Sequence, residues 1–86
     1  MNINQLIETV KNKLSKNIVC ENIEIEDKTF LHTNHSSHDK NKFHIKLIIK
    51  SEYLKKKNKI QSTKDIYKIL NKELSENIHS IQILII

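Results

Sequence analysis

The 86-residue chain contains no glycine, no proline, no tryptophan and no arginine. A P-loop or a dinucleotide-binding loop requires glycine where the backbone approaches phosphate, so neither motif can form here. Arginine makes most of the bidentate contacts that read guanine bases and bind phosphates. These absences exclude the common nucleotide-binding motifs, and they weaken the case for sequence-specific recognition of DNA.

Cysteine occurs once, as Cys20. A single cysteine permits neither an internal disulfide nor a zinc site built from cysteines. Its neighbours Ile18 and Val19 are aliphatic, and a lone cysteine in such surroundings is usually a small buried hydrophobic side chain. We therefore expect Cys20 to have a packing role.

Length and charge predict one small domain over residues 1–86. No apolar run approaches the ~20 residues that a membrane-spanning helix needs. The first residues, MNINQLIETVKNKL, lack the apolar core of a secretory signal, so the expected location is cytoplasmic. All 15 basic residues are lysines and the formal net charge is +5, which permits loose attraction to polyanions.

The first 27 residues predict a helix followed by a strand. Residues 4–16 carry Ile7, Val10 and Leu14 at helical spacing, with Leu6 beside them, which is typical of an amphipathic helix. The segment NIEIED, residues 22–27, then alternates isoleucine with acidic side chains, as a half-buried strand does.

Residues 42–50, KFHIKLIIK, predict a second strand, which would pair with the first in antiparallel orientation. Alternate apolar side chains define its buried face: Phe43, Ile45, Leu47 and Ile49. Because His44 alternates with Ile45, we expect its side chain to lie on the surface.

The remaining residues predict two helical segments and a third strand. SEYLKKKNKI, residues 51–60, indicates a short helical turn and a basic loop. A capping box with Ser62 as N-cap and Asp65 reaching back predicts a helix over about 63–75. IHSIQILII at the end alternates isoleucine as a strand. The order α-β-β-α-α-β predicts an α+β fold in which helices cover one face of a three-stranded mixed sheet.

Histidine is concentrated in one segment. Four of the five histidines lie between residues 32 and 44: His32, His35, His38 and His44. The first three, His32, His35 and His38, have the spacing H-x-x-H-x-x-H, which matches no recognised zinc motif, and such a segment is most often a solvated polar loop. The spacing does not exclude that one of these three side chains is a metal ligand. The fifth histidine, His79, stands at the start of the last strand.

The order of these elements, and the residues between them, resemble the BolA family. The matching pieces are IEIED with its histidine-bearing loop, FHIKLIIKSEY, IYKILNKEL and NIHSIQIL. Tyr53, Tyr67, Glu73 and Leu74 occupy family landmarks, and His79 falls on the histidine of the C-terminal signature. The resemblance covers about residues 5–84 and implies a fold like that of class II KH domains.

The resemblance also implies a function. BolA-like proteins pair with monothiol glutaredoxins, and the pair holds a [2Fe–2S] cluster at its interface. The glutaredoxin supplies a cysteine thiolate and a glutathione thiolate. By this resemblance, His79 is one ligand of the BolA-like chain and His32 is the other, with His35 or His38 as alternatives because the loop is long. The isolated protein is then expected to hold no cluster.

A second candidate site is a lysine-rich surface. Its members are Lys55, Lys56, Lys57, Lys59, Lys64 and Lys68. A solvated basic loop is the simplest interpretation. The alternatives are an acidic partner surface or nucleic acid, because some BolA proteins regulate transcription through this region.

Departures from the family pattern weaken the nucleic-acid alternative. Lys55 replaces the usual glycine, and Ser62-Thr63-Lys64 replaces an Arg-His-Arg triplet. A chain without glycine also lacks the Gly-x-x-Gly clamp of KH domains. No Ser/His/Asp or Cys/His arrangement for nucleophilic catalysis is apparent, so we expect a binding protein and no enzyme.

Overall fold

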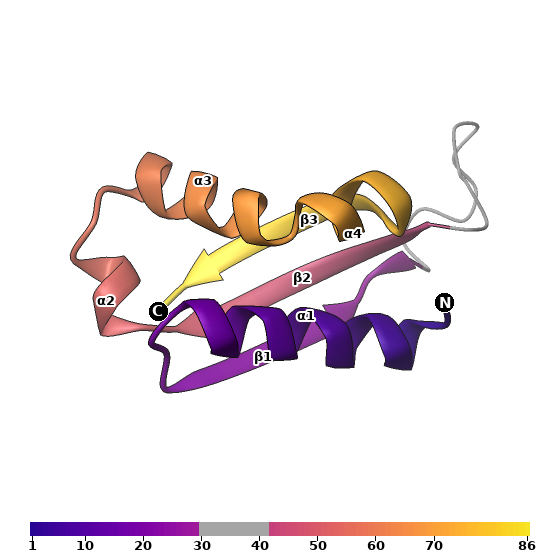
Figure 1. Cartoon of the computed structure of the whole chain (residues 1–86), viewed down its shortest axis with the longest axis horizontal. Helices are drawn as coiled ribbons and strands as arrows, with labels where there is room; N and C mark the ends of the chain where they lie inside the picture. The colour runs from indigo at the N-terminus through magenta and orange to yellow at the C-terminus, as the bar shows by residue number, and fades with distance from the viewer. Residues whose placement is uncertain (30–41) are drawn as a thin grey trace.

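The computed structural model describes residues 1–29 and 42–86 as helices packed on a three-stranded sheet (Figure 1). In chain order the elements are α1 (Ile3–Asn17), β1 (Asn22–Asp27), β2 (Phe43–Lys50), α2 (Glu52–Lys55), α3 (Lys59–Ile69), α4 (Asn71–Glu76) and β3 (Ile78–Ile85). The three predicted strands are confirmed. The helix predicted over 63–75 is divided into α3 and α4, because Leu70 between them leaves helical geometry at φ −95° and ψ 16°.

The sheet has the order β1-β2-β3 and is mixed, as predicted. β1 runs antiparallel to β2, with Ile25 opposite Leu47. β3 runs parallel to β2, with Ile83 opposite Leu47 on the other side. In Figure 1, α1 crosses in front of β1 and α4 in front of β3, while α3 runs alongside β3 and α2 stands at the end of β2. Buried side chains of the helices and of the sheet form one core cluster, so the helices cover one face of the sheet.

The core lies between the helices and the sheet. It is a single cluster of fully or nearly fully buried aliphatic side chains: Leu6, Val10, Leu14, Ile18, Ile45, Leu47, Ile49, Leu54, Ile66, Leu70 and Ile78. Each such side chain contributes about 1.5–3 kcal/mol through burial. On α1 the buried stripe runs through Leu6, Val10 and Leu14, whereas Ile7 is only half-buried. None of the helices in the described parts of the chain is long and apolar enough to cross a membrane.

Two helices begin with the same Asn-x-x-Gln pattern. Asn2 accepts a hydrogen bond from the backbone of Gln5, and Asn58 accepts one from the backbone of Gln61. The prediction that Ser62 caps its helix is therefore wrong, since α3 begins four residues earlier than predicted. Ser62 lies inside α3, fully buried, and its hydroxyl donates to the carbonyl oxygen of Leu54 at 2.8 Å.

An ion pair with one buried partner joins the first helix to the fourth. Lys13 Nζ on α1 lies 2.6 Å from Glu73 Oε2 on α4. The Glu73 side chain is only 4% exposed, whereas that of Lys13 is 37% exposed. Glu73 Oε1 is buried and has no hydrogen-bond partner among the described residues. A buried carboxylate in this position depends on the lysine for compensation.

Replacing Lys13 by methionine is expected to lower the free energy of unfolding by about 2 kcal/mol, because the Glu73 carboxylate would remain buried without its partner. Urea denaturation of this variant, compared with Lys11→Met at an exposed position of the same helix, measures the loss. The double variant Lys13→Met/Glu73→Leu should recover most of the stability, because it removes both charges. Equal midpoints for Lys13→Met and Lys11→Met would contradict a structural role for the pair.

Candidate functional site

His79 is the extra residue of a β-bulge at the start of β3. Phe43 is paired with Ile78 and His44 with Ser80, so one residue of β3 has no counterpart on β2. The alternation of burial breaks at the same place, because Ile78 is buried while His79 and Ser80 are both exposed. A bulge commonly redirects a side chain near a functional site. Here it presents an exposed imidazole at the end of the sheet.

The structure brings His44 against His79. The two ring centroids are 4.8 Å apart, with 30° between the ring planes. His44 is only 6% exposed, and its Nδ1 lies 2.7 Å from the hydroxyl oxygen of Ser80. The expectation that His44 is a surface side chain is therefore wrong. Strand alternation does direct it away from the core, but the bulge places His79 over its ring and the register places Ser80 opposite.

A turn at the end of β1 fixes the backbone beside these histidines. Asp27 Oδ1 accepts hydrogen bonds from the backbone and the hydroxyl of Thr29. The same hydroxyl accepts a hydrogen bond from the backbone N–H of His44 at 3.2 Å. Lys28 N–H also donates to the carbonyl oxygen of His44. The described part of the β1–β2 connection thus ends next to the histidine pair.

The remaining predicted ligands lie outside the described residues. His32, His35 and His38 fall within residues 30–41, so their position relative to His79 stays a prediction. Within residues 1–29 and 42–86, no group of three or more His, Cys, Asp or Glu side chains could hold a metal ion. The described residues at this end of the sheet do offer two neighbouring imidazoles, one exposed on His79 and one buried on His44.

Cys20 lies at the opposite end of the sheet from the histidine pair. It precedes Asn22, which pairs with Lys50, whereas His44 begins the other end of β2. Cys20 is half-buried and packs against the core, in line with the expected packing role. Burial, and next the charge of Glu21, raise the pKa of its thiol. The thiol is therefore neither close to His79 nor activated as a thiolate.

The predicted lysine surface is divided by the structure. Lys55, Lys57 and Lys59 line one groove together with residues of β3. Lys56 is exposed beside them at the end of α2, and Lys64 and Lys68 are exposed along α3. The sequence indicated the basic region, but it did not indicate that the last strand forms one side of it.

Lys57 is held in place by two neighbours. Its Nζ lies 2.8 Å from Asp65 Oδ2 and 4.5 Å from the centre of the Tyr53 ring. The hydrogen bond to Asp65, and next that to Tyr53, raise the pKa of Lys57. Hydrogen bonds from Lys57 and Gln61 lower the pKa of Asp65. The charge of Lys57 is therefore largely satisfied within the chain.

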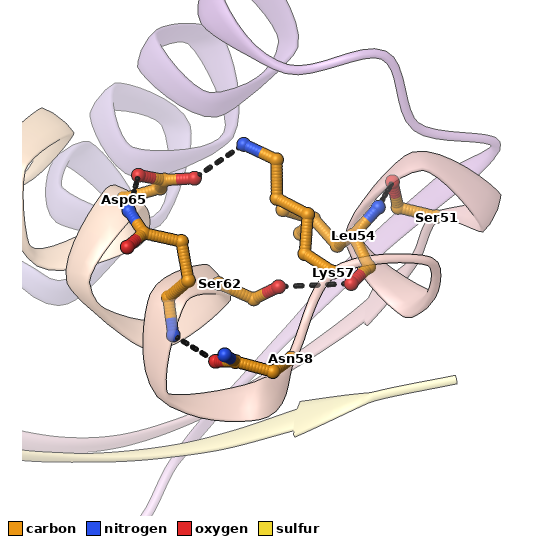
Figure 2. Close-up of polar contacts among 7 residues, drawn as sticks. Ser51, Leu54, Lys57, Asn58, Ser62 and Asp65 are labelled. Atoms are coloured by element: carbon orange, nitrogen blue, oxygen red, sulfur yellow. Dashed lines mark hydrogen bonds and ion pairs between the residues drawn. The ribbon is translucent and has the colours of Figure 1, made fainter.

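Hydrogen bonds around two buried serines and a helix cap join α2 to α3 (Figure 2). Ser51 Oγ accepts from the backbone N–H of Leu54, and Ser62 Oγ donates to the carbonyl oxygen of the same residue. Asn58 caps α3 between them. The short turn between the helices is thus anchored without glycine, and the groove lysines extend from a backbone that is held at several points.

Comparison with known proteins assigns the fold to one family. The model of the family described as BolA-like protein matches residues 14–86. The comparison with curated proteins gives no match.

Solved structures of BolA proteins have the same fold. The BolA domain of SufE1 from Arabidopsis thaliana is 25% identical, with a TM-score of 0.79 over 99% of this chain and 92% of that one. BolA1 from Arabidopsis thaliana is 23% identical, with a TM-score of 0.77 over 92% and 87%. BolA1 from Mus musculus is 16% identical, with a TM-score of 0.73 over 92% of this chain and 62% of that one. With the family match over most of its length, the chain belongs to the BolA-like family.

Proposed function

We propose that this BolA-like protein is a cytoplasmic adaptor that pairs with a monothiol glutaredoxin and shares a bridging [2Fe–2S] cluster with it, in iron–sulfur cluster trafficking or iron sensing. The observation that carries the proposal is the exposed His79 imidazole, presented by a β-bulge and stacked on His44. An adaptor needs a ligand that a partner can reach, and His79 has that exposure.

The chemistry of the donor set supports a shared site. A [2Fe–2S] cluster requires four protein or cofactor ligands, and two imidazoles can replace two thiolates on one iron. The partner would supply the thiolates of its cysteine and of glutathione. Neutral imidazole ligands leave less negative charge on the cluster than thiolates do. This side of the centre is then easier to release, which suits transfer or sensing.

This chain must supply a second ligand besides His79. The family resemblance assigns it to His32, with His35 and His38 as alternatives. His32 follows Thr29 by three residues in the sequence, and three residues of chain reach at most about 10 Å. Thr29 contacts the backbone of His44, beside His79. His35, six residues from the same point, has a longer covalent reach, so chain length permits both residues and the preference for His32 rests on the family resemblance.

Two roles in the site are consistent with the position of His44. It either orients His79 through the stacked contact or competes with the loop histidines as the second ligand. Ser80 bonds its Nδ1, and a hydrogen bond at one imidazole nitrogen commonly fixes the ring orientation of a ligating histidine. At the end of β1, Asp27 bonds Thr29 and Glu26 is paired with Lys28, so both of these carboxylates already have partners. We infer a binding role for this end of the sheet and no catalytic one.

Substituting His79 by alanine should abolish the visible absorption and circular dichroism spectrum that distinguishes the mixed pair from the glutaredoxin alone. His32→Ala should change that spectrum more than His35→Ala or His38→Ala. The measurement is made on each variant after co-expression with a monothiol glutaredoxin and purification without oxygen. Gln82→Ala, at an exposed position further along β3, is the matched control and should leave the spectrum unchanged.

Two results would separate an error in the proposed site from an error in the choice of its second ligand. An unchanged spectrum in His79→Ala would contradict the proposed site itself. A larger effect of His44→Ala than of His32→Ala would leave the shared cluster in place and assign the second ligand to β2.

The isolated protein should retain no cluster, because its imidazoles leave the irons short of ligands. Iron and acid-labile sulfide are measured after anaerobic reconstitution of the pure chain and desalting, and both should fall to background. Adding apo-glutaredoxin and glutathione to the same mixture should restore stoichiometric iron and sulfide. A stable cluster on the pure chain would argue against a shared site.

A further inference from the structure

A groove lies at the end of β3 that is remote from His79. It has a volume of about 240 Å³ and is formed by α2, the turn before α3 and the last residues of β3. The lining residues are Leu54, Lys55, Lys57, Lys59, Ile83, Leu84 and Ile85. Three lysines therefore stand along a groove whose remaining side chains are all aliphatic.

One side of this groove is an unpaired strand edge. β3 is the last strand of the described sheet and pairs only with β2. Ile86 N–H donates to the carbonyl oxygen of Ile49, and Ile86 accepts from Ser51, so the polar groups of Ile86 point toward β2. Successive residues of a strand direct these groups to opposite edges. The N–H and C=O groups of Ile83 and Ile85 therefore point to the open edge, beside the groove.

Two of the three lysines have charge available for a partner. Lys57 is engaged by Asp65, whereas Lys55 and Lys59 are exposed and form no ion pair with any described residue. Leu84 adds an apolar surface that is 45% exposed. The groove thus combines a row of backbone donors and acceptors, aliphatic walls and two free positive charges.

This combination suits an extended peptide better than single-stranded nucleic acid. Strand addition uses backbone hydrogen bonds for affinity and side-chain pockets for selectivity. Sequence-independent binding of nucleic acid usually relies on aromatic side chains that stack on bases. None of the residues lining the groove is aromatic.

We infer that an extended segment of a partner protein, with acidic side chains alternating with aliphatic ones, adds to the open edge of β3 between Lys55 and Lys59. The segment forms backbone hydrogen bonds with Ile83 and Ile85. Its aliphatic side chains contact Leu84 and the floor of the groove, and its carboxylates neutralise the two lysines. This docking function is independent of the cluster site, since His79 takes no part in it.

The binding test uses a fluorescein-labelled nine-residue peptide of alternating glutamate and valine, blocked at both ends, with fluorescence anisotropy as the readout. The wild-type protein should bind it, and should not bind the peptide with lysine in place of glutamate. The double variant Lys55→Glu/Lys59→Glu should weaken binding about tenfold or more, since two attractive charges become repulsive. Lys11→Glu/Lys72→Glu changes the net charge equally on α1 and α4, away from the groove, and should bind nearly as the wild type does.

Amide hydrogen exchange of the complex, followed by NMR, tests the strand pairing itself. Exchange at Ile83 and Ile85 should slow when the peptide binds, while exchange at Leu84, whose N–H already points to β2, should change little. Binding without slower exchange at Ile83 and Ile85 would overturn strand addition. Equal losses in the two charge-reversal variants would overturn the assignment to this groove.

A nine-nucleotide oligothymidine is titrated in parallel as the competing occupant. Tighter binding of the oligonucleotide than of the acidic peptide, sensitive to Lys55→Glu/Lys59→Glu, would overturn the proposal in favour of nucleic acid. Failure of both probes to bind would also overturn it. Peptide binding alone, with the expected loss in the groove variant, supports a protein partner.

Discussion

The parallel pairing of β2 with β3 is the constraint on which both candidate sites depend. In a parallel pair both strands start at the same end, so His44 at the start of β2 and His79 at the start of β3 become neighbours although 35 positions separate them in sequence. An antiparallel β3 would place His79 at the far end of β2. The same pairing brings the end of β3 beside α2 and the groove lysines, because α2 directly follows the end of β2.

The two sites therefore lie at opposite ends of one strand. Five residues separate His79 from Leu84, which corresponds to about 16 Å along a strand. That distance is small enough for one globular partner to cover both ends. The bulge affects only the histidine end, whereas Ser51, Asn58 and Ser62 anchor the groove end (Figure 2). Each end can thus be changed by mutation with little effect on the other.

Most of the fold could be predicted from the sequence because its elements have clear periodicity. The alternating isoleucines predicted which face of each strand is buried, and the helical spacing of apolar side chains predicted α1. The predicted start of α3 was wrong, because Ser62 is a residue type that often caps helices but here lies fully buried inside the helix. The sequence did contain the correct signal, since the Asn-x-x-Gln pattern that begins α1 also occurs at Asn58. The position of His44 could not be predicted, because it depends on a one-residue bulge in a pairing between distant segments. For the same reason, the sequence placed the lysines in a basic loop without indicating that β3 lines their groove.

The proposed function rests on the claim that the imidazole of His79 ligates a cluster shared with a glutaredoxin. The most direct test is pulsed electron paramagnetic resonance of the reduced mixed pair, in which only the BolA-like chain carries ¹⁵N-labelled histidine. We expect ¹⁵N hyperfine coupling from directly bound imidazole in the wild-type pair, and no such coupling in a sample prepared in the same way with His79→Ala. A reduced cluster that shows no coupling to the labelled histidines would contradict the claim, because all of its ligands would then come from the partner and glutathione.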